Sequence, residues 1–312
     1  MENGKSFNQQ SLECAWRQIH DILFHPGTGM VYDYVTSHDP NHRFDHLPSP
    51  EEIAAGFPNP CGWSTGMEDC ALNGGILLDL MRFRGWENSV FAAKIAEGVI
   101  RCGTVHGQDG FIARGISPHD GKSCYSNSSR DQFTLAVYGM WRFLKGCAIS
   151  GILRENGIRF LRSVADYCER TITPEHRYNL LRLDGHQAVV SSLWDCDPHE
   201  AMRLPMIYGI AWDMTGEPHY FDLMNRYAQA GLRHTLTLIS CSPQNHIWPG
   251  IFLPEHRIQI AFPAEKTGAP VTGKRFTPHT HRECSPVVIK RSPVAAECFS
   301  FAKQLCSRCS FR

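Results

Sequence analysis

The sequence has no excess of either charge and no long apolar run, and both absences narrow what the protein can bind. Its 31 basic residues balance its 31 acidic residues, so nothing indicates a surface that binds nucleic acid. No apolar run approaches the roughly 20 residues that a membrane-spanning helix needs, so we expect no membrane partner. The N-terminal segment lacks the charged-then-apolar layout of a signal peptide. The sequence as written predicts a cytoplasmic protein, or a periplasmic or secreted one if its N-terminus is incomplete.

The sequence also lacks a disulfide framework and the usual metal-binding spacings. Its 13 cysteines are an odd number, and most stand singly in helical patterns, where a free cysteine behaves as a small buried hydrophobe. This indicates a reducing compartment. No H-x-x-x-H or H-E-x-x-H spacing is present, and Cys306-x-x-Cys309 with His279 and His281 fits no zinc pattern. We therefore expect no metal and no cofactor.

Apolar residues at helical spacing are abundant and predict an all-α fold. The hydrophobic fraction of 42% is enough for a sizeable core. The predicted helices cover residues 7–24, 66–84, 88–105, 129–145, 151–172, 197–216 and 218–238. Within the sixth, Asp197 is the expected N-cap, with Pro198 and Glu200 in the first turn and Pro205 as the site of a kink.

The connections between these helices alternate between long and short. Three tight hairpins are joined by long loops, so antiparallel packing places every long loop at one end, with the N-termini of helices 66–84, 129–145 and 197–216. This alternation predicts an (α/α) toroid of helical hairpins, similar to an (α/α)6 barrel. Seven helices are too few to close six hairpins, so the toroid is incomplete at its C-terminus.

The helical period stops after Leu238, which predicts a boundary between two parts of the chain. Residues 1–240 form the expected α/α toroid catalytic domain. Residues 241–312 are an irregular tail rich in proline and cysteine. We interpret the sequence beyond about residue 262 as truncated or out of frame.

The segment Asn59–Arg84 passes from a loop rich in glycine, proline and tryptophan into the second predicted helix. Thr65 and Glu68 have the spacing of a capping box, which would place Glu68 and Asp69 in the first turn, beside the positive end of the helix dipole. Trp63 lies just upstream. The pattern fits an ordinary helix start as well as the acidic mouth of a sugar-cleaving pocket, and both interpretations stay open.

A second segment, Gly110–Gln132, combines an isolated arginine with another acid at a helix start. Arg114 stands among apolar residues in a glycine-rich loop, and its planar guanidinium suits a carboxylate of a substrate. Asp131 is either a helix cap or an acid that faces the same cleft as Glu68. Two carboxylates that converge from different helices are what hydrolysis of a glycosidic bond requires.

Further side chains near these helix starts are predicted to bind substrate. Aromatic rings could stack on sugars, and polar groups in the loops could bind hydroxyl or carboxylate groups. They are Trp63, Tyr125, Trp194, Arg43, His46, Arg130, Gln132 and Asp195. Each aromatic residue taken alone fits a place in the core better than a place in a binding site.

Two of these segments resemble a known group of bacterial glycan-degrading enzymes. NPCGWSTGMEDCALNGG and GFIARG with DGKSCYSNSSRDQFTLAVYGMWRF are similar to the six-hairpin glycosidase superfamily, and within it to glycoside hydrolase family 154, the β-glucuronidase-like group. The resemblance covers roughly residues 10–240. It implies an (α/α)6 barrel, a substrate that carries a uronic acid, and acid/base carboxylates at the barrel mouth.

The sequence is therefore interpreted as a glycoside hydrolase that acts on uronic-acid-containing oligosaccharides. Glu68 and Asp131 form the predicted acid/base pair, with Asp69 in reserve and Arg114 as the substrate clamp. A polysaccharide lyase on the same scaffold is one alternative, with Tyr125 or His119 as its base. A non-catalytic glycan-binding helical-repeat protein is the other. A homo-oligomer is left open.

Overall fold

The computed structural model describes residues 7–146, 151–194 and 200–239. These residues belong to the first of two compact units of the chain, Met1–Ser240 and Cys241–Arg312. The tail predicted over residues 241–312, with its cysteines and histidines, lies outside the described residues.

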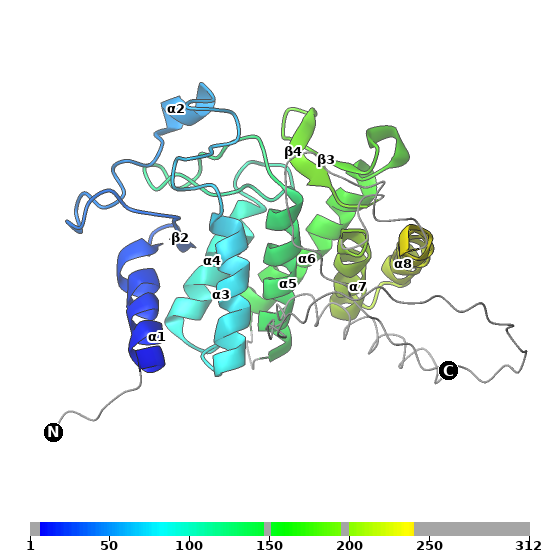
Figure 1. Cartoon of the computed structure of the whole chain (residues 1–312), viewed down its shortest axis with the longest axis horizontal. Coiled ribbons are helices and arrows are strands. Elements are labelled where there is room, and N and C mark those ends of the chain that lie inside the picture. The colour runs from blue at the N-terminus through cyan, green and yellow to red at the C-terminus, as the bar shows by residue number, and fades with distance from the viewer. Residues whose placement is uncertain (1–6, 147–150, 195–199, 240–312) are drawn as a thin grey trace, which may run out of the picture. The chain divides into compact units, whose positions relative to one another are not determined.

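The described part of the chain is mostly helical, which confirms the all-α prediction at that level (Figure 1). Its helices are α1 (Phe7–Arg17), α2 (Pro50–Ala54), α3 (Cys70–Arg84), α4 (Val90–Cys102), α5 (Arg130–Gly146), α6 (Ile152–Thr171), α7 (Arg203–Thr215) and α8 (Pro218–Ile239). A π-helical turn at Gln18–Leu23 continues α1, and a short 3-10 turn covers Pro174–His176. None of the described helices has both the length and the apolar character needed to cross a membrane.

Two small antiparallel hairpins interrupt the helices. Strand β1 (Phe24–His25) pairs with β2 (Met30–Val31), with Phe24 opposite Val31. Strand β3 (Asn179–Leu181) pairs with β4 (Gln187–Ser192), with Asn179 opposite Ser192 and a register shift before Leu181. Neither hairpin was predicted, because strands this short leave little alternation of polar and apolar residues to detect.

The predicted alternation of long and short connections is confirmed. Helices α3 and α4 are joined by a short turn that begins at Gly85, in the left-handed conformation at φ 72°. A short turn at Gly216 likewise joins α7 to α8. The long connections precede α3, α5 and α7, and Figure 1 shows them at one end of the helices together with α2 and the β3–β4 hairpin.

Successive hairpins pack side by side. Helix α5 lies against α3 and α7, and α4 lies against α6. The helices that follow long connections therefore form one row, α3–α5–α7, and the first helices that follow short connections, α4 and α6, begin a second row. This order places the N-termini of α3, α5 and α7 beside one another.

Helices α3 and α5 approach so closely that glycine is required at their crossing. A Cβ atom on Gly139 would stand 2.0 Å from the carbonyl oxygen of Gly75, and one on Gly75 would stand 2.1 Å from that of Leu135. Real Cβ atoms essentially never come that near to a backbone atom. The distance between the two helices, and hence between the groups at their N-termini, is fixed by these glycines.

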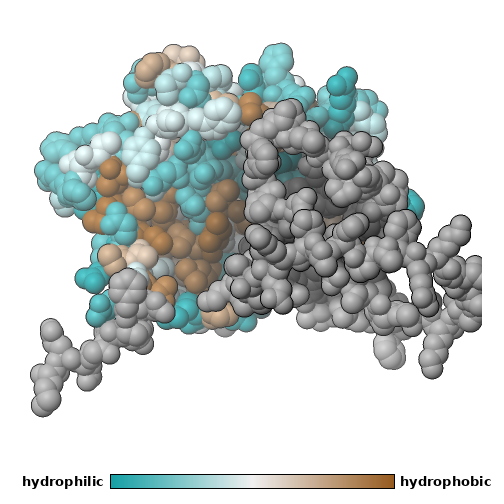
Figure 2. Space-filling model, in the orientation of Figure 1, coloured by the Kyte–Doolittle hydropathy of each residue, from teal (hydrophilic) through white to brown (hydrophobic). Residues whose placement is uncertain are grey.

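Three apolar residues that recur at helical spacing in α3 face away from the core. Ile76, Leu80 and Phe83 are exposed, Phe83 by 80%, whereas Leu78 and Met81 on the opposite side are buried. Helix α3 is thus apolar on both sides, and Figure 2 shows apolar surface in its region. Helical spacing identifies a helix correctly here but does not identify the side that is buried.

Helix α7 begins later than predicted. It starts at Arg203 rather than near Asp197, so Glu200 lies before the helix instead of in its first turn. Asp197 and Pro198 lie outside the described residues. Pro205 is the third residue of α7, where a backbone N–H has no partner within the helix, so it removes no helical hydrogen bond and needs no kink.

Candidate functional site

Charged side chains from three helix starts and two connections gather at the end of the helices where the long loops lie. We name this group the charged cluster, and its members interact with one another directly or through a shared neighbour. They are Asp33, Glu68, Asp69, Arg114, Arg130, Asp131, Glu200 and Arg203. Glu68, Asp69, Arg114, Arg130 and Asp131 were predicted to belong together.

The start of α3 differs from the predicted capping box. The hydroxyl of Thr65 donates to the carbonyl of Gly62 rather than capping the helix, and α3 begins at Cys70. Asp33, far away in sequence, holds the backbone just before the helix: its Oδ2 accepts from the backbone N–H of Glu68 at 2.9 Å and of Asp69 at 3.3 Å. The helix itself is capped by the Arg114 carbonyl, which accepts from the N–H of Ala71 at 2.9 Å, and by the side chain of Gln132. Glu68 and Asp69 therefore precede the first turn, in a backbone that a distant carboxylate holds in place.

The carboxylate of Asp33 is itself affected by this position. Its Oδ1 accepts from the side-chain amide of Asn73 at 3.1 Å. Burial, which outweighs the hydrogen bonds from Glu68 and Asp69, raises the pKa of Asp33 from 3.8 to about 6. Asp33 was not among the predicted site residues, because it lies in a loop with no motif around it.

Arg114 and Gln132 hold the backbone of Glu68 from the side. Both donate to the Glu68 carbonyl oxygen, each at 3.1 Å. Gln132 also accepts from the backbone N–H of Leu72 at 2.9 Å, so this buried amide bridges α5 to the start of α3. Gln132 thus serves to position the site rather than to contact a ligand, which corrects its predicted role.

Arg114 is only 6% exposed. Its Nη1 lies 3.7 Å from Asp69 Oδ1, and its Nε is buried without a hydrogen-bond partner. Burial lowers its pKa, opposed by the charges of Asp69, Glu68 and Asp131, but an arginine stays protonated in proteins. Arg114 therefore acts on the site chiefly as a buried positive charge among three carboxylates.

Asp69 presents a carboxylate to solvent beside this charge. Its side chain is 45% exposed, and its Oδ1 accepts from Gln132 Nε2 at 2.7 Å. Partial burial, opposed by Arg114 and reinforced by Glu68 and Asp131, raises the pKa of Asp69. A carboxyl group with a raised pKa, reachable by a ligand, has the properties of a general acid.

Asp131 pairs with an arginine at the start of α7. Its side chain is 41% exposed, and Oδ1 lies 2.9 Å from Arg203 Nη1. Arg203 also donates to Thr134 at 2.8 Å, which fixes the guanidinium against α5. This pairing holds the Asp131 carboxylate at the start of α5, where solvent can still reach it.

Arg203 is held in turn by Glu200. The Glu200 carboxylate pairs with Arg203 Nε and, at 2.9 Å, with Arg130 Nη2. Its side chain is only 5% exposed. Glu200 therefore ties the approach to α7 to the start of α5. Arg130, predicted to bind substrate, lies in this ion-pair network.

Glu68 is constrained by its own loop. Its Oε2 accepts from the backbone N–H of Ser64 at 2.9 Å. Ser64 has φ 65°, a conformation that residues other than glycine adopt at an energetic cost. The Glu68 side chain thus stabilises a strained turn, which makes it a weaker candidate for proton transfer than Asp69.

The three predicted stacking residues have different surroundings. Trp63 is 42% exposed in the loop before Glu68 and remains available to a ligand. Tyr125 is buried, with its ring where a Cβ on Gly62 would be and its hydroxyl donating to the Phe57 carbonyl, so its predicted stacking role is wrong for this structure. Trp194 packs against Tyr178 and Tyr227 and has no contact with the charged cluster among the described residues.

The remaining predicted binding residues lie elsewhere or outside the described residues. His46 stacks on Tyr34, with ring centroids 5.1 Å apart. Arg43 donates to the carbonyl of Asp21 and lines a hollow of about 390 Å³ with Phe24, His25 and His119. None of the cluster residues lines this hollow. Asp195 lies outside the described residues.

The arrangement places two partly exposed carboxylates, Asp69 and Asp131, at the starts of neighbouring helices beside one buried arginine. Such a pair can donate and accept protons at a bond placed between them. Comparison with protein-family models, with curated proteins and with solved structures gives no match to this chain.

Proposed function

We propose that the protein is a glycoside hydrolase that cleaves uronic-acid-containing oligosaccharides, with Asp69 as general acid and Asp131 as general base or nucleophile. The observation that carries this proposal is the placement of two partly exposed carboxylates, each beside an arginine, at the starts of neighbouring helices. Burial raises the pKa of Asp69, while Arg203 pairs with Asp131 at 2.9 Å. Two carboxyl groups that flank one bond are what acid/base cleavage of a glycosidic bond requires.

Asp69 replaces Glu68 in the acid role that the sequence predicted. The Glu68 carboxylate accepts from the Ser64 N–H. The hydrogen bond and the ion pair of the Asp69 carboxylate with described residues are both made through Oδ1, which leaves Oδ2 for a ligand. The acid would protonate the leaving oxygen, and Asp131 would activate water or attack the anomeric carbon.

Positive charge at the site supports a substrate that carries a carboxylate. Arg114 supplies buried charge next to Asp69, and Arg130 and Arg203 remain 25% and 20% exposed in their side chains. The exposed indole of Trp63 provides an apolar face of the kind that sugar rings contact. Uronic acids combine both features, an anionic group and an apolar ring face.

The scaffold that we propose for this site is the (α/α) toroid. The row α3–α5–α7 and the contact of α4 with α6 follow the order of hairpins in such a ring. A toroid collects the N-termini of its inner helices at one mouth, where the cluster carboxylates and arginines lie. The apolar, exposed side of α3 is consistent with a helix that has neighbours on both sides in a complete ring.

Turnover of chromogenic β-glucuronides and β-glucosides tests the proposal. Asp69→Asn and Asp131→Asn would each be compared with wild type after circular dichroism shows an unchanged helical fold. Each is expected to lower kcat/KM by about 100-fold or more, because general acid/base catalysis contributes about 10²–10⁴. Added azide should restore turnover in Asp131→Asn if Asp131 is the nucleophile.

Asp79→Asn is the matched control. Asp79 is also a carboxylate of α3 paired with an arginine, Arg142 at 2.8 Å, but it lies outside the charged cluster. It should leave turnover unchanged. If both cluster variants keep wild-type activity, the charged cluster has only a structural role. If a folded wild type binds sugar without turnover, the glycan-binding alternative is favoured.

The lyase alternative has less support in this structure. Tyr125 is buried, and burial raises its pKa to about 12. His119 Nε2 lies 2.8 Å from the carbonyl oxygen of Leu47. Neither base is at the charged cluster. A product that absorbs through a new C=C bond would nevertheless overturn the hydrolase assignment.

A further inference from the structure

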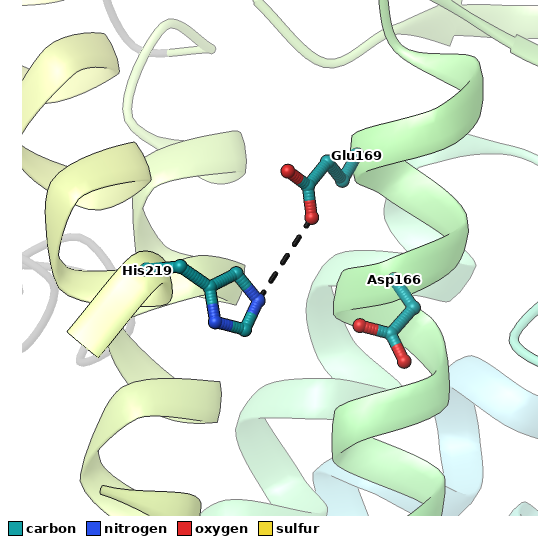
Figure 3. Close-up of side chains that lie close together, drawn as sticks. All are labelled: Asp166, Glu169 and His219. Atoms are coloured by element: carbon teal, nitrogen blue, oxygen red, sulfur yellow. Dashed lines mark ion pairs between the residues drawn. The ribbon is translucent and has the colours of Figure 1, made fainter. Parts of the chain in front are cut away.

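Three metal-ligating side chains converge on a different part of the molecule, between α6 and the start of α8. Asp166 and Glu169 lie one turn apart on α6, and His219 is the second residue of α8 (Figure 3). One ligand atom from each of the three lies within 4.8 Å of the others. We name this group the α6–α8 triad.

The spacing within the triad is too long for hydrogen bonds between its members. His219 Nε2 stands 3.9 Å from Glu169 Oε2, beyond the roughly 2.7–3.2 Å of a hydrogen bond between nitrogen and oxygen. Two ligands of one tetrahedral zinc ion lie about 3.4 Å apart, given metal–ligand bonds of about 2.0–2.2 Å. A slight contraction of the triad would therefore place all three atoms around a single cation.

Neighbouring side chains orient two of the three ligands. The hydroxyl of Tyr220 donates to Asp166 Oδ1, which leaves Oδ2 for another partner. The rings of His219 and Tyr220 lie 3.8 Å apart and restrict the imidazole. Hydrogen bonds from outside the ligand set commonly orient metal ligands in this way.

The charge around the triad also favours a cation. Arg162 Nε lies 4.0 Å from Asp166 Oδ2, and the same guanidinium pairs with Glu217 at 3.3 Å. His219 Nδ1 lies 3.8 Å from Glu217 Oε2. Arg162 is thus shared between two carboxylates, Asp166 and Glu217, while Glu169 has an ion pair among the described residues only with His219.

We propose that the α6–α8 triad binds a divalent transition-metal ion, Zn²⁺ in the first place, through Asp166, Glu169 and His219. The imidazole favours zinc and its neighbours over Mg²⁺ and Ca²⁺, which prefer oxygen ligands alone. Three protein ligands leave a coordination position for water. The side chains are 39–47% exposed, so a metal can reach them from solvent.

Bound metal would connect two hairpins. The described helices α6 and α8 are linked at this point by side chains, while α7 packs against both. A metal held by α6 and α8 at once would fasten the α7–α8 hairpin to the α5–α6 hairpin. The sequence analysis did not predict this metal site, because its three ligands lie on two helices and form no short spacing motif.

Cobalt binding to the full chain, stripped of metal with a chelator, tests this proposal. Co²⁺ reports its ligands: thiolate ligands give strong charge-transfer bands, and an oxygen/nitrogen site gives none. This separates the triad from the many cysteines elsewhere in the chain. We expect wild type to bind one Co²⁺ without thiolate bands, and to show a higher melting temperature with Zn²⁺.

His219→Ala and Glu169→Gln should each weaken this binding by at least about 10-fold, the lower end of the effect seen even for residues that only support a ligand. His176→Ala, an exposed histidine outside the triad, is the control and should bind as wild type. Equal stoichiometry, affinity and zinc-induced stabilisation in wild type and both triad variants would overturn the proposal.

Discussion

The carboxylate of Asp33 accepts a hydrogen bond from the backbone N–H of Glu68 at 2.9 Å, across 35 positions of sequence. The same oxygen accepts from Asp69, so one side chain in the first long loop holds the backbone that carries the proposed general acid just before α3. The first loop and the start of α3 are therefore one structural unit. The stability of this unit and the geometry of Asp69 should change together.

Removal of the Asp33 carboxylate should destabilise the protein. Asp33→Ala leaves two backbone N–H groups without their acceptor, and we expect the free energy of unfolding to fall by about 1–3 kcal/mol, the usual cost of an unsatisfied buried donor. Asp33→Asn should retain most of the stability, since its amide oxygen can accept both bonds and Asn73 can rotate to present its own oxygen. Urea unfolding followed by circular dichroism measures both. Equal losses in the two variants would show that the hydrogen bonds are not the reason.

Asp33 should also make stability depend on pH in a definite direction. Its pKa is about 6 in the folded protein against an ordinary 3.8, so the folded state binds the proton more tightly than the unfolded state. Stability should therefore be highest below about pH 4, fall as the pH rises to about 6, and then level off. The loss is at most about 3 kcal/mol, at about 1.4 kcal/mol per pKa unit, and is smaller because Asp33 is partly exposed.

Asp33→Asn provides the comparison for this pH effect. The variant cannot ionise at position 33, so its stability curve should lack the decline between about pH 4 and pH 6 that wild type shows. Unfolding in urea at several pH values gives the difference between the two proteins directly. Parallel curves for wild type and Asp33→Asn would contradict the raised pKa.

The helical hairpins were predictable from sequence because they depend on local information. Apolar residues at helical spacing indicate where helices lie. Glycines that end a helix, such as Gly85 and Gly216, indicate where short turns occur. The side of α3 that is buried was not predictable in this way. It is decided by Gly75 and Gly139, which allow close approach of α5, and a glycine contributes nothing to an apolar pattern.

The site was predictable only in part, for a related reason. Asp69, Arg114 and Asp131 stand in glycine-rich or helix-start contexts that mark them from sequence. Asp33 and Glu200 were not assigned roles in the site, because their partners lie far away in the chain. The capping box of Thr65 and Glu68 failed because a stronger acceptor, the Asp33 carboxylate, arrives from outside the segment.

Substitution at the crossing of α3 and α5 should be severely destabilising. In Gly139→Ala the new methyl group would meet the backbone of Gly75 at 2.0 Å, and a backbone cannot move aside as a side chain can. We expect a loss of about 3 kcal/mol, the upper end for overpacked cores. Gly185→Asn, in an open turn with no atom within 4 Å of its Cβ position, should cost far less. Similar melting temperatures for the two variants would contradict the close approach.

Substitution of Glu200 measures how much the ion pairs of the charged cluster contribute to the free energy of unfolding. The Glu200 side chain is 5% exposed and lies between Arg130 and Arg203, so Glu200→Gln leaves two arginines beside a neutral group where water screens poorly. We expect a loss of about 3 kcal/mol, as for other broken buried pairs.

The exposed pair of Lys94 and Glu97 supplies the comparison, because Glu97→Gln should cost less than about 1 kcal/mol. Arg203 also holds Asp131, so Glu200→Gln should lower glycosidase turnover even at temperatures where the variant remains folded. If Glu200→Gln keeps full turnover but loses stability, Glu200 only joins α7 to α5. Arg203 would then orient Asp131 without the help of Glu200.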